Sequence, residues 1–130
     1  MAFSIMVVDD EPDVVDLFRQ RFRREVRSGE YVLHFASSGE EALCRLDEIH
    51  PMLIVILSDI NMPGMDGLQL LGEIKQRRPA LPVLMVTAYG DQERRQRAAE
   101  LGAEAFLAKP IEFEQLKQQL RGLMPDPPDP

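Results

Sequence analysis

Polar residues with complementary chemistry follow four short apolar runs of this sequence. In chain order, these residues are Asp9, Asp10, Asp59, Thr87 and Lys109. Carboxylates that meet at one site repel one another, so they stay ionised together only where a cation compensates their charge. A hydroxyl and an ammonium group can both bind phosphoryl oxygens. The set therefore indicates a cation-dependent site for phosphoryl transfer.

The residue types also indicate which cation binds and which residue accepts the phosphoryl group. Mg²⁺ favours hard oxygen ligands, and a few carboxylates can hold it while other positions stay open for water or phosphate oxygens. Thr87 could hydrogen-bond one phosphoryl oxygen, and Lys109 could act as a point charge on another. A carboxylate can accept a phosphoryl group as an aspartyl phosphate. Asp59 stands alone after the central apolar run, so we expect it to be the acceptor.

The apolar runs are spaced so that one helix fits between each pair of neighbours. They cover residues 5–8, 31–36, 52–57, 83–86 and 106–108. Runs of this kind without polar alternation indicate strands buried on both faces, as in a parallel sheet covered by helices. The predicted fold class is therefore α/β, a doubly wound (βα)5 domain. Ligands of such sheets bind beyond the carboxyl ends of the strands, where the polar residues lie.

Apolar stripes and capping residues mark the helices between the strands. One stripe predicts a single helix after the first strand, and its members are Val14, Phe18, Phe22 and Val26. Pro12 suits the first turn of that helix, and Ser38 with Glu41 makes a capping-box pattern for the next one. Asp66 precedes Gly67 at a helix start, so we expect it to be a cap or turn residue and not a ligand.

Several reactive side chains are expected to have structural or surface roles. His34 lies within a strand and His50 lies just before Pro51, both far in sequence from the strand ends. Cys44, next to Leu43 on a helix stripe, is expected to be a small core residue. The basic residues of the first helix form a solvated face by default. The helix after the fourth strand carries Arg94, Arg95 and Arg97, for which a dimer contact with Glu112 or Glu114 is our hypothesis.

Composition bounds the domain organisation and the partners. The 130 residues are 45% apolar and 28% charged, which is typical of one compact domain. A net charge of −7 argues against a nucleic-acid-binding surface. One cysteine and no export leader fit a cytoplasmic protein, and no apolar run is long enough for a membrane span. Residues 1–124 are predicted to form the domain, and the proline-rich residues 125–130 a tail or the start of a linker.

Longer motifs around the polar residues resemble the receiver domain of two-component response regulators, the CheY-like family. The motifs are VVDDE at 7–11, SDINMPGMDG at 58–67, VTA at 86–88 and GAEAFLAKP at 102–110. Together they are very specific, and the resemblance runs from about residue 4 to residue 123. It implies a flavodoxin-like fold whose five parallel strands have the order 2-1-3-4-5, with helices on both faces.

The resemblance also implies the roles of the site residues. Asp10 and Asp59 would bind Mg²⁺ directly, and the backbone carbonyl of Asn61 would be a third ligand. Asp9 would act through a water. Mn²⁺ can substitute for Mg²⁺. The phosphoryl donor would be a phosphohistidine of a sensor histidine kinase or of a histidine phosphotransfer protein. The domain would assist its own phosphorylation and dephosphorylation, as a signalling phosphoacceptor and not as an enzyme. Lys109 would precede a cis proline.

The family's switch can be placed on this sequence residue by residue. Thr87 would move toward the phosphoryl group, and Phe106 would turn inward behind it, although phenylalanine has no hydroxyl to bond outside. The fourth helix, the fifth strand and the fifth helix would then present the output face to a downstream effector domain or protein, or to a second copy of the chain. Ala88 would leave room for the donor, and Tyr89 would cover the acyl phosphate.

Three other functions remain as alternatives. A phosphatase of the haloacid-dehalogenase type needs a general acid two residues after its nucleophile, where this chain has Asn61. A flavodoxin-like FMN carrier needs a Ser/Thr/Gly phosphate loop after the first strand, where this chain has carboxylates. A receiver used only for docking would lack site residues, whereas all of the expected ones are present. Asp9, Asp10 and Glu11, taken alone, could also be no more than the acidic start of a helix.

The residue after Ala88 generates a first prediction. Replacing Tyr89 with alanine should speed the loss of the phosphoryl group from Asp59, because a smaller side chain leaves the acyl phosphate open to water. The decay of the phosphorylated protein, followed by intact mass, measures this effect. A decay that is unchanged or slower in Tyr89→Ala contradicts the prediction.

Overall fold

A five-stranded parallel sheet forms the centre of the molecule. The computed structural model describes residues 3–49, 53–87 and 91–123. The strands are β1 (Phe3–Val8), β2 (Tyr31–Ala36), β3 (Leu53–Asp59), β4 (Val83–Thr87) and β5 (Ala105–Ala108). They pair in parallel in the order β2-β1-β3-β4-β5. The predicted fold class and strand order are therefore confirmed.

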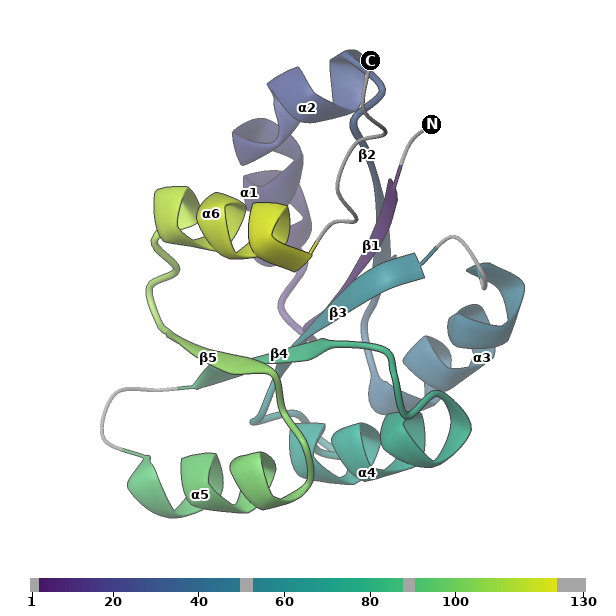
Figure 1. Ribbon diagram of the computed structural model, residues 1–130, viewed down its shortest axis with the longest axis vertical. Coiled ribbons are helices and arrows are strands. Elements are labelled where there is room, and N and C mark those ends of the chain that lie inside the picture. The colour runs from purple at the N-terminus through teal and green to yellow at the C-terminus, as the bar shows by residue number, and fades with distance from the viewer. Residues whose placement is uncertain (1–2, 50–52, 88–90, 124–130) are drawn as a thin grey trace.

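Helices cover both faces of this sheet (Figure 1). They are α1 (Pro12–Arg21), α2 (Arg23–Arg27), α3 (Gly39–Ile49), α4 (Gly67–Arg77), α5 (Gln92–Glu100) and α6 (Phe113–Leu123). The helices α1, α2 and α6 lie on one face, and α3, α4 and α5 lie on the other. Because two helices replace the first predicted one, the helices that were expected as fourth and fifth are α5 and α6.

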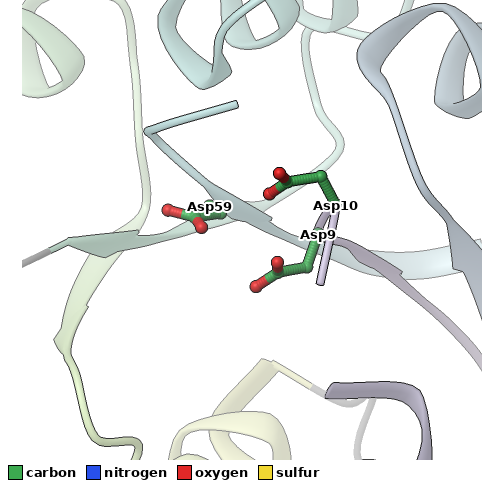
Figure 2. Close-up of side chains that lie close together, drawn as sticks. All are labelled: Asp9, Asp10 and Asp59. Carbon is green, nitrogen blue, oxygen red and sulfur yellow. The ribbon is translucent and has the colours of Figure 1, made fainter. Parts of the chain in front are cut away.

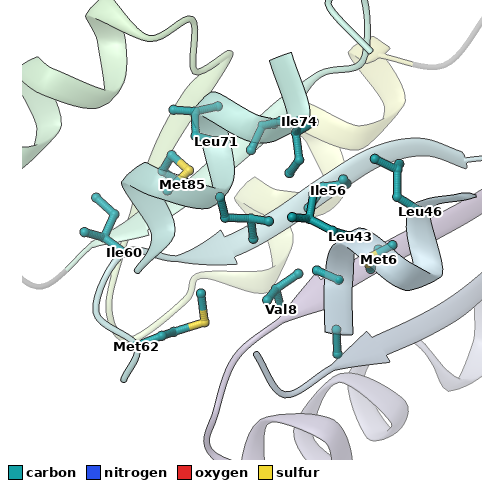
Figure 3. Close-up of a cluster of buried hydrophobic side chains, with 14 of the residues drawn as sticks. Met6, Val8, Leu43, Leu46, Ile56, Ile60, Met62, Leu71, Ile74 and Met85 are labelled. Atoms are coloured by element: carbon teal, nitrogen blue, oxygen red, sulfur yellow. The ribbon is translucent and has the colours of Figure 1, made fainter. Parts of the chain in front are cut away.

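Alternate residues of each strand point to opposite faces, so the sheet separates two apolar cores. Met6, Val8 and Ile56 face the core under α3 and α4, which Figure 3 shows together with Leu71 and Met85. The second core lies under α1 and α6. Its buried members include Ile5, Val7, Leu57, Phe18 and Leu116. Burial on both faces explains why the strands read as continuous apolar runs.

The prediction of a single helix after β1 was wrong for the second half of that segment. Helical geometry breaks at Phe22, where φ is −104° and ψ is 14°, and α2 starts at the next residue. The Phe22 ring is buried, stacked on Phe18 at 5.8 Å between ring centroids and edge-on to Tyr31 at 6.0 Å. The chain turns after this anchor, and Val26 is 43% exposed instead of continuing the buried stripe.

The expected caps are confirmed in part. Pro12 occupies the first turn of α1, and Asp66 caps α4 in a full capping box with Gln69. At α3, the Ser38 hydroxyl accepts a hydrogen bond from the backbone N–H of Glu41 at 3.1 Å. The Glu41 carboxylate, however, accepts from the backbone and hydroxyl of Ser37, so the second half of that predicted box is displaced by one residue.

Cys44 is exposed, which contradicts its predicted place in the core. Leu43 and Leu46 of the same helix are buried against the sheet. Successive helical residues are rotated by about 100°, so the residue after Leu43 leaves the apolar stripe. His50, Ala88, Tyr89 and the proline-rich residues 125–130 lie outside the described residues. Among the described helices, none is long and apolar enough to cross a membrane.

Gly67 allows α4 to begin directly against the end of β3. Its backbone N–H donates to the Ile60 carbonyl at 2.8 Å. A Cβ at this position would lie 2.3 Å from the Asp59 carbonyl oxygen and 2.6 Å from the Ile60 Cα. Both neighbours are backbone atoms, which cannot rotate away. The absence of a side chain at Gly67 therefore allows α4 to lie this close to Asp59, the residue expected to accept the phosphoryl group.

Gly67→Ala should lower the free energy of unfolding by about 1–3 kcal/mol, the range for an overpacked site that must shift backbone. Gly72→Ala, in the same helix, is the matched control because a Cβ there meets nothing within 4 Å. The free energy of unfolding of Gly72→Ala should equal that of the wild type or exceed it by up to about 1 kcal/mol, because alanine favours the helix over glycine by that amount. Urea unfolding of both variants measures the difference, and equal stabilities would contradict this account.

Candidate functional site

The sheet register brings the polar strand ends to one edge. Asp59, the last residue of β3, pairs with Val86 of β4. Thr87 pairs with Ala108 of β5, and the Thr87 carbonyl accepts a hydrogen bond from the Lys109 backbone N–H at 3.0 Å. Residues from four strand ends thus meet where the sequence predicted a common site.

Three carboxylates lie together at this edge (Figure 2). Asp9, Asp10 and Asp59 each offer one oxygen, and these oxygens lie within 4.8 Å of one another. Asp59 is buried, Asp9 is half-buried and Asp10 is exposed. The predicted clustering is confirmed. A donor set made of carboxylate oxygens fits a hard divalent cation such as Mg²⁺.

Lys109 is the cation that contacts the buried acid. Its Nζ donates to Asp59 Oδ2 at 2.7 Å. Burial by itself would lower the pKa of Lys109, but the hydrogen bond and the negative charge of Asp59 outweigh it, so the pKa lies above its ordinary value. Lys109 therefore stays charged and neutralises one of the three carboxylates.

Asp9 carries the unfavourable part of this arrangement. Burial raises its pKa above the usual value, and the charge of Asp59 raises it further, against the opposing hydrogen bond from the Glu11 backbone N–H. A raised pKa means that the folded protein holds the ionised carboxyl less favourably than the unfolded chain does. Ionised Asp9 therefore costs stability at neutral pH, and a bound cation would offset that cost.

The loop after β3 contacts the other carboxylate oxygen of Asp59. The backbone N–H of Asn61 donates to Asp59 Oδ1 at 3.1 Å. The preceding residue, Ile60, donates its N–H to the Val86 carbonyl at 3.1 Å and ties the loop to β4. Both carboxylate oxygens of Asp59 are thus held in place, one by Asn61 and one by Lys109.

Two arginine contacts near the site were missed by the sequence analysis. Arg94 Nη1 donates to the side-chain oxygen of Asn61, and the guanidinium of Arg95 lies 5.1 Å from the centroid of the Phe106 ring. The sequence feature that could have indicated these contacts is the pair Arg94 and Arg95, early in the helix predicted after Thr87. The hypothesis that these arginines contact Glu112 or Glu114 of a second copy stays a prediction, since one chain does not test it.

The structure also places Thr87, Phe106, Pro110 and His34, while the roles expected of Thr87 and Phe106 stay predictions. Thr87 is buried at the end of β4, and Phe106 of β5 packs in part against the core under α3 and α4. The bond between Lys109 and Pro110 is cis. His34 forms a hydrogen bond with the Ser4 hydroxyl at 3.1 Å, and burial together with the charge of Arg45 lowers its pKa. His34 therefore has the structural role that was expected.

The fold and the acidic edge together define a CheY-like α/β domain. Residues 5–121 match the response regulator receiver domain family, and the chain belongs to that family. This family is one of signalling domains, and a two-component response regulator is among the relatives of this chain.

Relatives share the domain within longer proteins. The two-component response regulator PhoP of Pseudomonas aeruginosa is 32% identical over 121 residues, which are 93% of this chain and 51% of PhoP. The sensor histidine kinase RcsC of Escherichia coli is 38% identical over 116 residues, which are 89% of this chain and 12% of RcsC. The chain thus spans about half of the first protein and a smaller share of the second.

Solved structures show the same architecture. A response regulator receiver domain protein from Clostridium thermocellum has a TM-score of 0.84 at 26% identity, covering 93% of each chain. The receiver domain of NtrX from Brucella abortus has a TM-score of 0.80 at 32% identity, covering 92% of this chain and 96% of that one.

The raised pKa of Asp9 leads to a stability prediction. Without divalent cations at pH 7, Asp9→Asn should melt at a higher temperature than the wild type, because one desolvated and repelled charge is removed. Added Mg²⁺ should raise the melting temperature of the wild type, since a ligand of the folded state stabilises it, and should raise that of Asp9→Asn less.

Asp16→Asn is the control, because Asp16 is an exposed acid of α1 outside the carboxylate cluster. Thermal melts in EDTA and in MgCl₂ compare the three proteins. The account of the acidic edge is wrong if Asp16→Asn gains as much as Asp9→Asn, or if Mg²⁺ shifts none of them.

Proposed function

We propose that this receiver domain is a phosphoacceptor that takes a phosphoryl group from a histidine onto Asp59 in the presence of Mg²⁺. The contact that supports this most directly is the 2.7 Å ion pair between Lys109 and the buried Asp59 beside two further carboxylates. A buried carboxylate held at both oxygens is oriented for attack, and a neighbouring cation can stabilise the charge that is transferred.

The transfer can be written with the residues of this chain. One Asp59 oxygen bonds to phosphorus while the bond between phosphorus and the donor imidazole nitrogen breaks, and the imidazole leaves with its electron pair. Lys109 and the Thr87 hydroxyl bind phosphoryl oxygens. Mg²⁺, held by Asp10, Asp59 and the Asn61 carbonyl, with Asp9 acting through a water, would neutralise charge on the transferring group.

Phosphorylation would act on the surface through Thr87 and Phe106. The new group carries about −1.5 to −2 charges at neutral pH, and its oxygens attract the hydroxyl and ammonium donors at the strand ends. As Thr87 moves toward them, Phe106 turns inward and changes the face formed by α5, β5 and α6. This face would contact an effector domain, an effector protein or a second copy of the chain.

The partners follow from the same chemistry. A sensor histidine kinase or a histidine phosphotransfer protein would supply the phosphoryl group, and the reaction would take place in the cytoplasm. The transfer would involve neither nucleic acid nor a membrane, and a net charge of −7 disfavours contact with the phosphate backbone of nucleic acid. Ala88 would admit the donor, and Tyr89 would shield the product.

The proposal predicts the result of a mass measurement. With acetyl phosphate and Mg²⁺, the wild type should gain one phosphoryl group of about 80 Da. Asp59→Asn should gain nothing, because the amide nitrogen is no nucleophile at this position, and EDTA should abolish the gain in the wild type. Intact mass spectrometry measures all three samples side by side.

Asp66→Asn is a suitable control, since Asp66 lies in the loop that follows Asp59 and caps α4. It should be labelled as the wild type is. No gain of mass in the wild type, under conditions that label a known receiver, would support a docking-only module. Label that persists in Asp59→Asn would move the acceptor to another residue.

A further inference from the structure

Arg94 bridges the two segments that flank the acceptor. It belongs to α5, which follows β4, and its Nη1 donates to the side-chain oxygen of Asn61 in the loop after β3. The Nε of Arg94 also lies 3.9 Å from a carboxylate oxygen of Asp91, the residue that precedes α5. Asp91 therefore holds the guanidinium from one side while Asn61 holds it from the other.

The bridge reaches the acceptor through a single residue. The backbone N–H of Asn61 donates to Asp59 Oδ1, while its exposed side chain receives the arginine. The backbone of Asn61 is thus anchored to the Asp59 carboxylate, and its side chain is held by Arg94. Asn61 contacts Oδ1 of Asp59, whereas Lys109 contacts Oδ2.

We propose that Arg94 is a positioning residue that holds the Asn61 side chain across the mouth of the site and so limits the approach of water to phosphorylated Asp59. This inference rests on the proposed function. In the reaction that it slows, a water oxygen bonds to phosphorus while the bond between phosphorus and Asp59 breaks. Inorganic phosphate leaves with the water oxygen and both of its protons, one of which can pass on to solvent, and Asp59 is regenerated as a carboxylate.

An arginine suits this role better than a lysine would. Its planar guanidinium presents several N–H donors in a fixed arrangement, so it can bind the Asn61 amide and the Asp91 carboxylate at the same time. Lysine keeps the charge, but its three donors sit on one nitrogen and lack that planar arrangement. Arg94→Lys should therefore restore only part of the effect.

The decay of the phosphorylated protein tests the proposal. Wild type and variants are labelled with acetyl phosphate and Mg²⁺, the donor is removed by desalting, and the labelled fraction is followed by intact mass. Arg94→Ala should lose its label about three to ten times faster than the wild type, the range for loss of one exposed hydrogen bond of ordinary net strength. Arg94→Lys should fall between the two.

Arg97→Ala is the matched control, because Arg97 lies on the same helix and lines a groove beside α4 with Leu68 and Gly72. It removes the same charge and should decay as the wild type does. A lifetime that shortens equally in Arg97→Ala would show an effect of net charge alone and would overturn the proposal.

A double-mutant cycle tests whether Arg94 acts through Asn61. Asn61→Ala should shorten the lifetime, and adding Arg94→Ala to it should change nothing further, because the group being positioned is already absent. Effects that multiply independently would overturn the proposal. The Mg²⁺ affinity of Arg94→Ala, measured by calorimetry, should not fall, and a fall that matches the change in lifetime would assign the effect to the cation.

The outcome for the wild type separates this inference from the proposed function. A wild type that takes up no phosphoryl group overturns the proposed function, and the inference with it. A wild type that is labelled on Asp59, with Arg94→Ala decaying at the same rate, overturns only the role of Arg94.

Discussion

Repulsion among three carboxylates is the constraint on which the arrangement of this domain depends. The ends of β1 and β3, two strands that also bury the core, bring one oxygen each of Asp9, Asp10 and Asp59 within 4.8 Å of one another. Lys109 neutralises the most buried of them. Burial and, after it, the charge of Asp59 raise the pKa of Asp9. The charge balance of the three carboxylates and Lys109 therefore leaves room for a divalent cation.

The position of Lys109 in turn depends on the strand order. Lys109 follows β5, and β5 lies beside β4, whose last residue accepts the Lys109 backbone N–H. β4 lies beside β3, which ends in Asp59. A different strand order would place the Lys109 ammonium elsewhere along the sheet. The ammonium therefore reaches Asp59 only because β3, β4 and β5 are neighbours in this order.

Much of this arrangement could be predicted from the sequence. Doubly buried strands give continuous apolar runs, and polar residues directly after them must meet at the carboxyl edge of a parallel sheet. The cap formed by Asp66 is equally local, because it needs only the residues of one helical turn. These predictions depend on periodicity and chain order, and both can be read from the sequence.

What the sequence could not give depends on packing between distant segments. Val26 continues the apolar pattern of the first helix, but the buried ring of Phe22 packs against Tyr31 and Phe18, and the helix breaks there. Cys44 lies one residue from a buried leucine, and the edge of an apolar stripe is not defined to one residue. The Arg94 contact joins residues 33 positions apart, which no local pattern encodes.

The neighbouring contacts of α5 suggest how the site and the surface are connected. Arg94 contacts Asn61 beside the acceptor, and Arg95, the next residue, lies over the ring of Phe106. Phe106 has no hydroxyl to hold it at the surface, and a cation over the ring face is an attractive contact that does not need one. In the proposed switch, α5 therefore contacts both the chemical site and the aromatic residue that responds to it.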